Sequence, residues 1–175
     1  MSEITVRPLG EDDWKQYRDI RLTALRESPE AFAASFDEEE SFDEDYWRLR
    51  MKRSDRLVAE RDSTPLGIVS VGASSDDNPH TSELFGLWVS PEARGSGVAT
   101  ALVRAGANLA REQGQRQLAY WVGSDNGRAV AFASGFGFRP TAERRPMRVK
   151  SEDDEDEVAM VLALVGDRGS VPGAI

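Results

Sequence analysis

The stretch that decides the fold is LWVSPEARGSGVATALV, residues 87–103, which leads from an apolar segment through a turn into a helix. The helical repeat shows in apolar residues at the spacing of one helix face: Val98, Leu102, Ala105 and Leu109. A helix N-terminus presents unpaired backbone N–H groups and a positive dipole, so it binds phosphate where side chains leave room. Because Gly95 and Gly97 leave such room, the stretch predicts a phosphate-binding loop.

Two familiar phosphate-binding motifs do not match this stretch. A Walker P-loop ends in Gly-Lys-Ser or Gly-Lys-Thr, and the chain contains no such triplet. A dinucleotide fingerprint needs a third Gly or Ala where this chain has Thr100, and it follows the first strand of a βαβ unit. The remaining interpretations are a different class of phosphate loop, or a plain strand-to-helix connection that serves only packing.

Composition narrows the chemistry. The 175 residues, 39% of them hydrophobic, suit one domain over 1–165 with a flexible tail at 166–175. With no Cys and one His, the chain excludes thiolate nucleophiles and Cys- or His-rich metal sites, so we expect no metal. No apolar run approaches the roughly 20 residues of a membrane span, so we expect a soluble, cytoplasmic protein. A net charge of −9 argues against nucleic acid as a partner.

Hydrophobic periodicity predicts an α/β domain with the element order βααβββαβαββ. The expected strands are 4–8, 56–60, 66–74, 82–89, 117–122, 136–149 and 157–165. The expected helices are one that follows Gly10 with a buried stripe at Trp14, Tyr17, Ile20 and Ala24, two short ones within 29–53, and the helices 98–114 and 126–135. Ser28 before Pro29, and a capping box of Ser41 and Glu44, mark the two short helices. The acidic run 151–157 reads as a solvated hairpin loop.

Two segments of the chain match one known family. The loop supplies Val89, Pro91, Arg94, Gly95, Gly97, Val98 and Ala99, in the pattern V-x-P-x-x-R-G-x-G-V-A. The later segment SDNGRAVAFASGFGF supplies Asn126, Ala129, Gly137 and Phe138. Together they resemble the GCN5-related N-acetyltransferases (GNAT), whose loop holds the pyrophosphate of acetyl-CoA. The resemblance implies a mixed, mostly antiparallel central sheet flanked by helices.

The resemblance also implies acetyl-CoA as co-substrate and a path for it. Its pantetheine arm would pair with the backbone of one strand, its diphosphate would lie on the loop and helix start, and Asn126 would hold the arm from the other side. The implied cofactor-binding residues are Trp88, Val89, Arg94, Gly95, Ser96, Gly97, Val98, Ala99, Thr100, Asn126 and Phe132. The family separates strands 83–89 and 118–122 to admit the thioester. Gly86 marks either the accompanying bulge or a place without room for a side chain.

The chain departs from the family at the residue that protonates the departing thiolate. Counted from Asn126, the family's tyrosine falls on Ala133. A thiol has a pKa of about 8.5, so a thiolate is a tolerable leaving group near neutral pH. The ammonium formed by attack, water, Ser134 or Tyr120 could each supply the proton, and the sequence does not rank them.

A general base is needed because an alkyl amine with a pKa of about 10.4 arrives protonated. The family often uses a carboxylate on the strand before the glycine loop, which is Glu83 here, although a glutamate at a strand start is often only a solvated residue. The second candidate base is His80, which lies in a DDNPH turn.

The acceptor is the least determined partner. Between residues 29 and 53 lie seven acidic residues within FDEEESFDEDYW, and they either face the cleft and attract a small cationic amine or form a solvated helix rim. Three functions fit: a small-molecule amine N-acetyltransferase, a protein lysine or N-terminal acetyltransferase, and an acyl-CoA-binding module with weak catalysis. The last strands, with Arg144, Arg145 and Arg148, would contact the acidic loop or a partner, and a homodimer is allowed.

Overall fold

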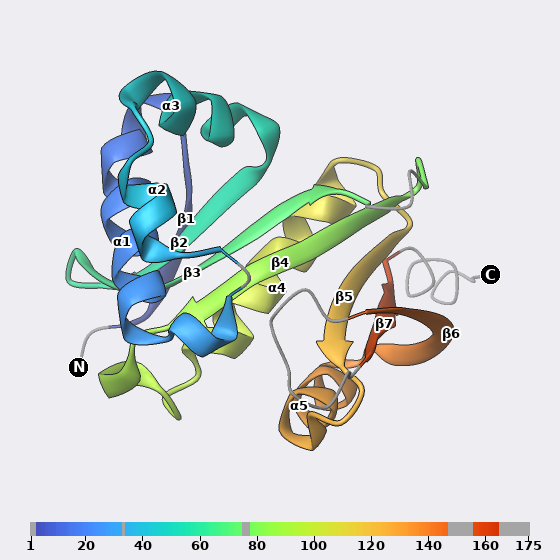
Figure 1. Ribbon diagram of the computed structural model, residues 1–175. Coiled ribbons are helices and arrows are strands. Elements are labelled where there is room, and N and C mark those ends of the chain that lie inside the picture. Colours follow the sequence, from blue (N-terminus) through green and yellow to red (C-terminus); the bar gives the residue numbers. More distant parts are fainter. Residues whose placement is uncertain (1–2, 33, 75–77, 147–155, 165–175) are drawn as a thin grey trace.

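The computed structural model describes residues 3–32, 34–74, 78–146 and 156–164. They build a seven-stranded sheet in the order β1-β2-β3-β4-β5-β7-β6 (Figure 1). The strands are β1 (Thr5–Leu9), β2 (Asp55–Arg61), β3 (Thr64–Ala73), β4 (Thr81–Val89), β5 (Gln117–Gly123), β6 (Arg139–Pro146) and β7 (Asp156–Ala163). Every neighbouring pair is antiparallel except β4 and β5, which are parallel. The predicted mixed, mostly antiparallel sheet is confirmed, but three helices precede β2, where the predicted order βααβββαβαββ has two.

Helices cover both faces of the sheet (Figure 1). The helices are α1 (Trp14–Glu27), α2 (Phe36–Glu40), α3 (Glu44–Arg53), α4 (Val98–Glu112) and α5 (Gly127–Phe136), with single 3-10 turns η1 (Glu11–Asp13), η2 (Pro29–Ala31) and η3 (Pro91–Ala93). The two faces bury separate cores. Val58 packs with α1 and α3, whereas its neighbours Leu57 and Ala59 pack with α4, because successive side chains of a strand point to opposite faces.

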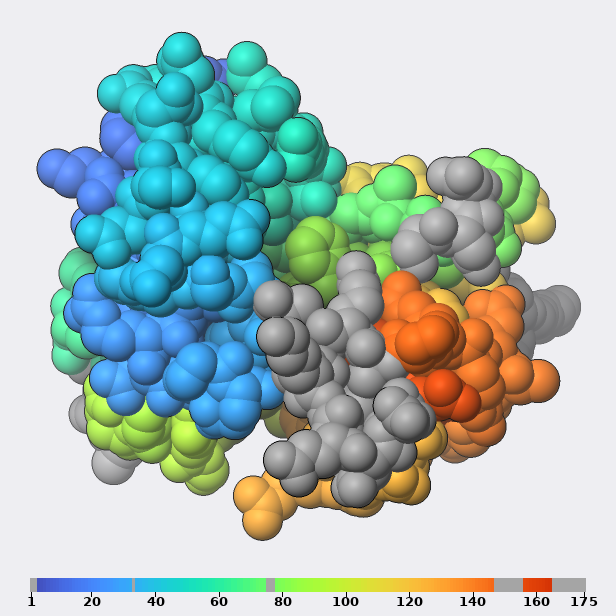
Figure 2. All heavy atoms as spheres, viewed as in Figure 1, coloured from blue at the N-terminus to red at the C-terminus, as the bar shows by residue number. Residues whose placement is uncertain are grey.

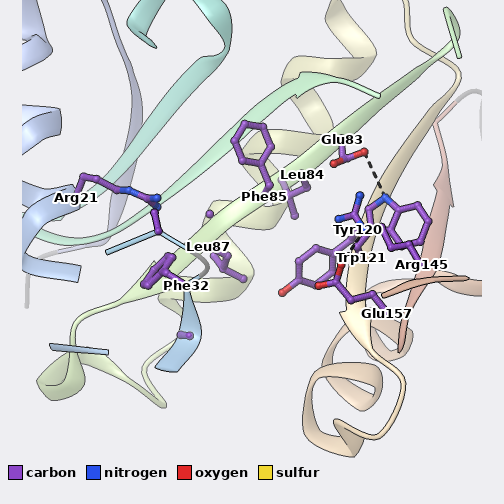
Figure 3. Close-up of a pocket in the computed structure, with 13 residues that line it drawn as sticks. Arg21, Phe32, Glu83, Leu84, Phe85, Leu87, Tyr120, Trp121, Arg145 and Glu157 are labelled. Carbon is purple, nitrogen blue, oxygen red and sulfur yellow. Dashed lines mark hydrogen bonds and ion pairs between the residues drawn. The ribbon is translucent and has the colours of Figure 1, made fainter. Parts of the chain in front are cut away.

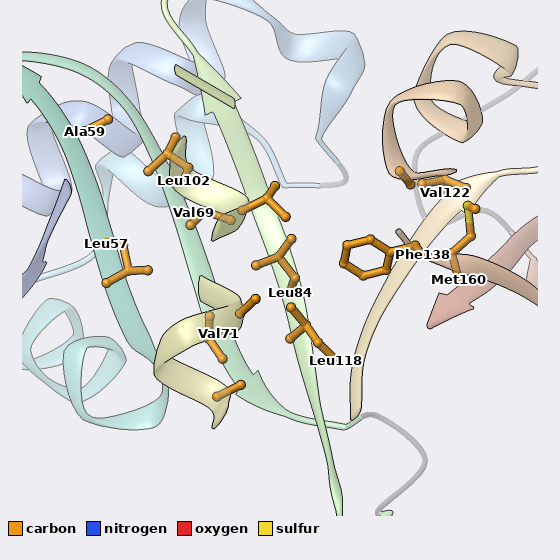
Figure 4. Packing of buried hydrophobic residues seen from close by; sticks show 14 of the residues in the cluster. Leu57, Ala59, Val69, Val71, Leu84, Leu102, Leu118, Val122, Phe138 and Met160 are labelled. Atoms are coloured by element: carbon orange, nitrogen blue, oxygen red, sulfur yellow. The ribbon is translucent and has the colours of Figure 1, made fainter. Parts of the chain in front are cut away.

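The α4 face carries the larger core (Figure 4). Val98 and Leu102 of α4 are buried against the sheet, as the helical spacing predicts, while Ala105 and Leu109 are only partly buried. Phe138, the residue just before β6, is fully buried in the same core. This core therefore joins α4 to the far half of the sheet.

The predicted stripe of α1 is also confirmed. Tyr17, Ile20 and Ala24 are buried, and Trp14 packs partly buried against the same core. Tyr17 meets the indole of Trp47 from α3 edge-on, with ring centroids 6.1 Å apart. These aromatic residues are therefore core residues.

The predicted capping box of Ser41 and Glu44 is wrong. Helix α3 is capped by Asp43, whose carboxylate accepts a hydrogen bond from the N–H of Tyr46 at 2.9 Å, so the aspartate nearer to the helix takes the capping role. Ser41 instead ends α2, where its hydroxyl donates to the carbonyl of Glu38. Ser28 precedes η2, but its side chain makes no capping hydrogen bond.

The acidic hairpin differs from the prediction at its end. Asp156 and Glu157 belong to β7, and the carboxylate of Glu157 lies 2.7 Å from the guanidinium of Arg145 on β6. The remaining predicted loop, Arg148 and the tail at 166–175 lie outside the described residues. β6 is the last strand of the sheet, so its outer edge has no partner strand among the described residues. The homodimer that the sequence allows stays a prediction.

One buried ion-pair group fixes α2 against its neighbours. The carboxylate of Glu39 accepts hydrogen bonds from Arg21 of α1 at 3.0 and 3.1 Å and from Arg50 of α3 at 2.8 Å. Burial alone would raise the pKa of Glu39, but the hydrogen bonds and charges of the two arginines lower it below its ordinary value. The other six acidic residues of the run are exposed.

A glutamate with a lowered folded-state pKa stabilises the protein above its unfolded pKa, and that contribution is lost as the pH falls through the folded pKa. We expect Glu39→Gln to lower the free energy of unfolding by about 3 kcal/mol at pH 7, because Arg21 and Arg50, whose side chains are only 11% and 13% exposed, lose their anion. The deficit should shrink as the pH falls below about 4.3, the unfolded value for Glu. Urea unfolding at several pH values measures this.

The matched control is Glu40→Gln, since Glu40 is exposed on the same helix. It should change the free energy by no more than about 0.5 kcal/mol. An equal loss in both variants, or a Glu39→Gln deficit that does not vary with pH, would contradict the assignment.

Candidate active site

The parallel strands β4 and β5 separate after four paired residues. The pairing runs from Thr81 opposite Gln117 to Leu84 opposite Tyr120 and then ends, although β4 continues to Val89. Within the described register, the second half of β4 pairs with β3 alone, so its other edge faces an opening. The predicted separation of these strands is confirmed (Figure 1).

Gly86 lies in a bulge at this opening. Ile68 of β3 pairs with Trp88, but Ser70 pairs with Phe85, so β4 has one extra residue there. The φ angle of Gly86 is +66°, and within the described part of the chain an added Cβ would meet only the Ser70 hydroxyl at 3.9 Å. Space is therefore sufficient, and the left-handed backbone is the reason for glycine.

The start of α4 faces open space. Gly97 is its N-cap with a φ of +91°, and its carbonyl accepts the hydrogen bond from the N–H of Ala101 at 3.0 Å. Among the residues that the structure describes, no side chain caps the helix. The φ of Gly95 is +81°, and a Cβ added at Gly95 or Gly97 would meet no atom of the described residues within 4 Å. The helix start can therefore accept an anion, because the backbone is accessible and the dipole is positive there.

The other residues of the loop are fixed by the protein itself. The guanidinium of Arg94 donates from Nε to the carbonyl of Val89 at 3.0 Å and from a terminal nitrogen to the hydroxyl of Ser28 at 3.3 Å. The same hydroxyl accepts from the indole of Trp88 at 3.4 Å. The hydroxyl of Ser96 donates to the carbonyl of Ala93. Arg94 therefore ties the loop to β4 and to the end of α1.

Several predicted cofactor residues surround the loop and the next helix. The side chains of Trp88 and Val98 are buried in the two cores, so only their backbones are placed to meet a ligand. The amide oxygen of Asn126 accepts from the N–H of Ala129 at 3.1 Å and so caps α5. Thr100 and Phe132 line one hollow of about 530 Å³ between α4 and α5, while Ala99 is half-buried in the first turn of α4.

A pocket of about 330 Å³ lies at the opening (Figure 3). On the molecular surface, the first helices lie on one side of this view and β6 on the other (Figure 2). The pocket receives side chains from α1 and η2 with the residues after it, from β4 and β5 at their separation, and from β6 and β7. The lining residues are Arg21, Ala31, Phe32, Ala34, Glu83, Leu84, Phe85, Gly86, Leu87, Tyr120, Trp121, Arg145 and Glu157. Elements distant in sequence thus enclose one cavity.

Glu83 is the carboxylate on the β4 wall of this pocket. It is 5% exposed, and its side chain accepts a hydrogen bond from the indole of Trp121 at 3.3 Å (Figure 3). The guanidinium of Arg145 lies 4.1 Å from the centroid of that indole ring, and it also pairs with Glu157. His80, the second candidate base, is exposed in its turn and does not line the pocket.

Comparison with known proteins agrees with this geometry. The model of the acetyltransferase (GNAT) family matches residues 14–138. The chain belongs to this family. An uncharacterized N-acetyltransferase of Methanocaldococcus jannaschii is 27% identical over 139 residues, which are 77% of this chain and 60% of that protein. This chain therefore spans less than two thirds of that relative.

Solved structures share the GNAT fold. The protein yncA of Salmonella typhimurium, solved with its cofactor acetyl-CoA, has a TM-score of 0.69 at 22% identity, covering 98% of this chain and 99% of that chain. A GNAT acetyltransferase of Streptococcus pneumoniae has a TM-score of 0.73 at 19% identity, covering 93% and 99%. In the described part of the chain, no helix combines the length and apolarity of a membrane span.

Ala133, which occupies the position of the usual GNAT tyrosine, does not line the pocket. Ala133 is 1% exposed and packs within the α4-side core, and Ser134 is exposed and does not line the pocket. Tyr120 does line it (Figure 3). Its ring meets Phe138 edge-on at 6.1 Å, and burial raises the pKa of its hydroxyl, which therefore stays protonated.

The acidic run does not contribute to this GNAT pocket. None of the seven residues lines it, and six of them are exposed, so the solvated-rim interpretation fits. Sequence reasoning missed Arg21, which does line the pocket. The signal was available, because Arg21 lies four residues after Tyr17 and beside Ile20, on a helix face that is otherwise apolar.

Gly97→Val tests the phosphate loop. The branched side chain would enter the open space at the start of α4, so we expect the Kd for CoA to rise at least about 100-fold. Calorimetric titration with CoA measures this. The matched control is Gly114→Val just past the other end of α4, where φ is +84° and no described atom lies within 4 Å of an added Cβ. Equal CoA affinity in the two folded variants would contradict the assignment.

Proposed function

We propose that this chain is an acetyl-CoA-dependent N-acetyltransferase that transfers acetyl to a primary amine by direct attack in a ternary complex. The observation that carries the proposal is the opening between β4 and β5, which has an accessible helix N-terminus near one end and a pocket with a buried carboxylate at the other. Each end suits one of the two substrates.

The donor side is assigned to the glycine loop and the opening. The N–H groups from Gly95 to Thr100 would hold the diphosphate, with the guanidinium of Arg94 keeping the loop in place. The free edge of β4 at Trp88 and Val89 would pair with the pantetheine arm, and Asn126 and Phe132 would bound it from α5. Acetyl-CoA, when bound, supplies the thioester carbonyl that the amine attacks.

The acceptor side is assigned to the pocket of Glu83. A protonated amine cannot attack, so a carboxylate must take its proton, directly or through water. The indole of Trp121 holds the Glu83 carboxylate in place. Glu83 lines the cavity at the point where the pairing of β4 and β5 ends. We therefore assign Glu83 as the general base.

The proton for the leaving thiolate is assigned to Tyr120. Of the side chains that could replace the missing tyrosine, Tyr120 lines the pocket and Ser134 does not. Its hydroxyl remains protonated at neutral pH, whereas the thiol that it would protonate has a pKa of about 8.5. Ala133 then needs no functional group, because β5 provides one in its place.

Glu83→Gln tests the base. Glutamine keeps the volume and can still accept from Trp121, but it cannot take a proton, so kcat/KM should fall at least about 100-fold. The deficit should be larger at lower pH, where less of the amine is unprotonated. Release of free thiol from acetyl-CoA, followed from pH 6 to pH 10, measures this, with the exposed Glu112→Gln as control. An unchanged pH profile would remove Glu83 from the mechanism.

Tyr120→Phe tests the acid. Phenylalanine keeps the contact with Phe138 and removes only the hydroxyl, so kcat should fall about tenfold or more while the affinity for CoA is retained. Tyr46→Phe is the control, because Tyr46 stacks on Phe42 and does not line the pocket. Equal kcat in the wild type and Tyr120→Phe would leave water or the amine as the proton source.

The function itself is tested by thiol release against amino acids, polyamines, aminoglycosides and basic peptides, with CoA titration alongside. Amine-dependent release would support the transferase and define the acceptor class. Tight CoA binding without release by any amine would contradict it and favour an acyl-CoA-binding protein.

A further inference from the structure

The acceptor pocket has charge of opposite sign on its two sides. Glu83 lies on the β4 wall, and Arg21 of α1 lies on the opposite wall (Figure 3). Arg145 and Glu157, the other charged side chains among the described residues of the lining, pair with each other at 2.7 Å. A carboxylate at Glu83 and a guanidinium at Arg21 thus line opposite sides of the pocket.

Two further arginines add positive charge close to Arg21. Arg21 and Arg50 share the carboxylate of Glu39, and a third arginine, Arg56, is 5% exposed nearby. Arg56 donates to the hydroxyl of Ser70 and to the carbonyl of Arg50, and its Nε is buried with no hydrogen-bond partner among the described residues. Burial and repulsion from Arg50 and Arg21 lower the pKa of Arg56. Positive charge thus exceeds negative charge in this group.

The guanidinium of Arg21 is placed to receive a ligand. Its hydrogen bonds to Glu39 use Nε and one terminal nitrogen, at 3.0 and 3.1 Å. The phenyl ring of Phe32, which also lines the pocket, lies 4.9 Å from the guanidinium carbon. An arginine has five N–H donors in a planar fork, so further donors are present beyond those that Glu39 uses. A carboxylate on the pocket side would meet a fixed donor and an excess of positive charge.

We propose that the acceptor carries a carboxylate as well as its amine, and that Arg21 binds this carboxylate while the amine lies at Glu83. This rests on the proposed transferase function and names its substrate class. A zwitterionic acceptor matches both sides of the pocket, whereas a polyamine would place a second cation beside Arg21. The acidic run that would have favoured polyamines lies outside the pocket.

Matched substrates test the proposal directly. Each protein amino acid is assayed by thiol release beside its carboxamide and its decarboxylated amine. We expect kcat/KM for the best acid to exceed that of its carboxamide at least about tenfold, the size of one charge-assisted hydrogen bond. The difference should lie in KM, because the carboxylate binds and does not react.

Variants of Arg21 test whether this residue causes the preference for the acid over the carboxamide. In Arg21→Gln with Glu39→Gln, no unpaired carboxylate is left in the core, and the ratio of acid to carboxamide should fall to about one. The single variant Arg21→Lys keeps the charge and tests the site if the double variant does not fold; it should lower the ratio in the same direction, because lysine lacks the fork. Arg48→Gln is the control, since Arg48 pairs with Glu44 and lies outside the pocket lining.

The outcomes separate this inference from the function it rests on. Turnover of carboxamides or diamines as fast as acids, or a ratio unchanged in both Arg21 variants, would overturn the carboxylate site and leave the transferase in place. Absence of thiol release with every amine would contradict the transferase itself, and the carboxylate site with it. A ratio that falls in the Arg21 variants and not in Arg48→Gln would support the site.

Discussion

The candidate site depends on the short pairing between β4 and β5. Two parallel strands would normally continue their ladder, but here it ends at Leu84 and Tyr120. The bulge at Gly86 bends β4 just beyond that point, and the core that includes Phe138 holds the paired half together. Backbone groups that would otherwise be saturated by a neighbouring strand become available to a ligand.

The helices supply one wall of the pocket, and a group of charged side chains holds this wall in place. Glu39 joins α1, α2 and α3 through Arg21 and Arg50, and this fixes one wall of the pocket. Breaking such a buried group costs more than an exposed pair, because an unpaired charge would remain inside the protein. The same group leaves Arg21 at the pocket surface with a defined orientation. Stability and recognition are thus served by the same side chains.

Much of the fold could be predicted from the chain. Apolar spacing located α4, the buried stripe of α1 and the strand pattern, because local periodicity reports which face is buried. The sequence predicted the ends of the helices less well than their existence. The capping box at Ser41 failed because Asp43 lies closer to the start of α3, and competing caps differ by little free energy. The charge run was also ambiguous, because composition does not say which side a residue faces.

The sequence by itself determined the glycine loop, the family resemblance, the candidate carboxylate Glu83 and the loss of the tyrosine at Ala133. These follow from residue types at fixed spacings, which local backbone geometry translates into structure. Only the tertiary structure decided that Gly86 is required for its left-handed backbone and that Tyr120 rather than Ser134 lines the pocket. It alone brought Arg21 opposite Glu83. Such choices depend on contacts between residues distant in the chain, and a linear pattern does not contain their distances.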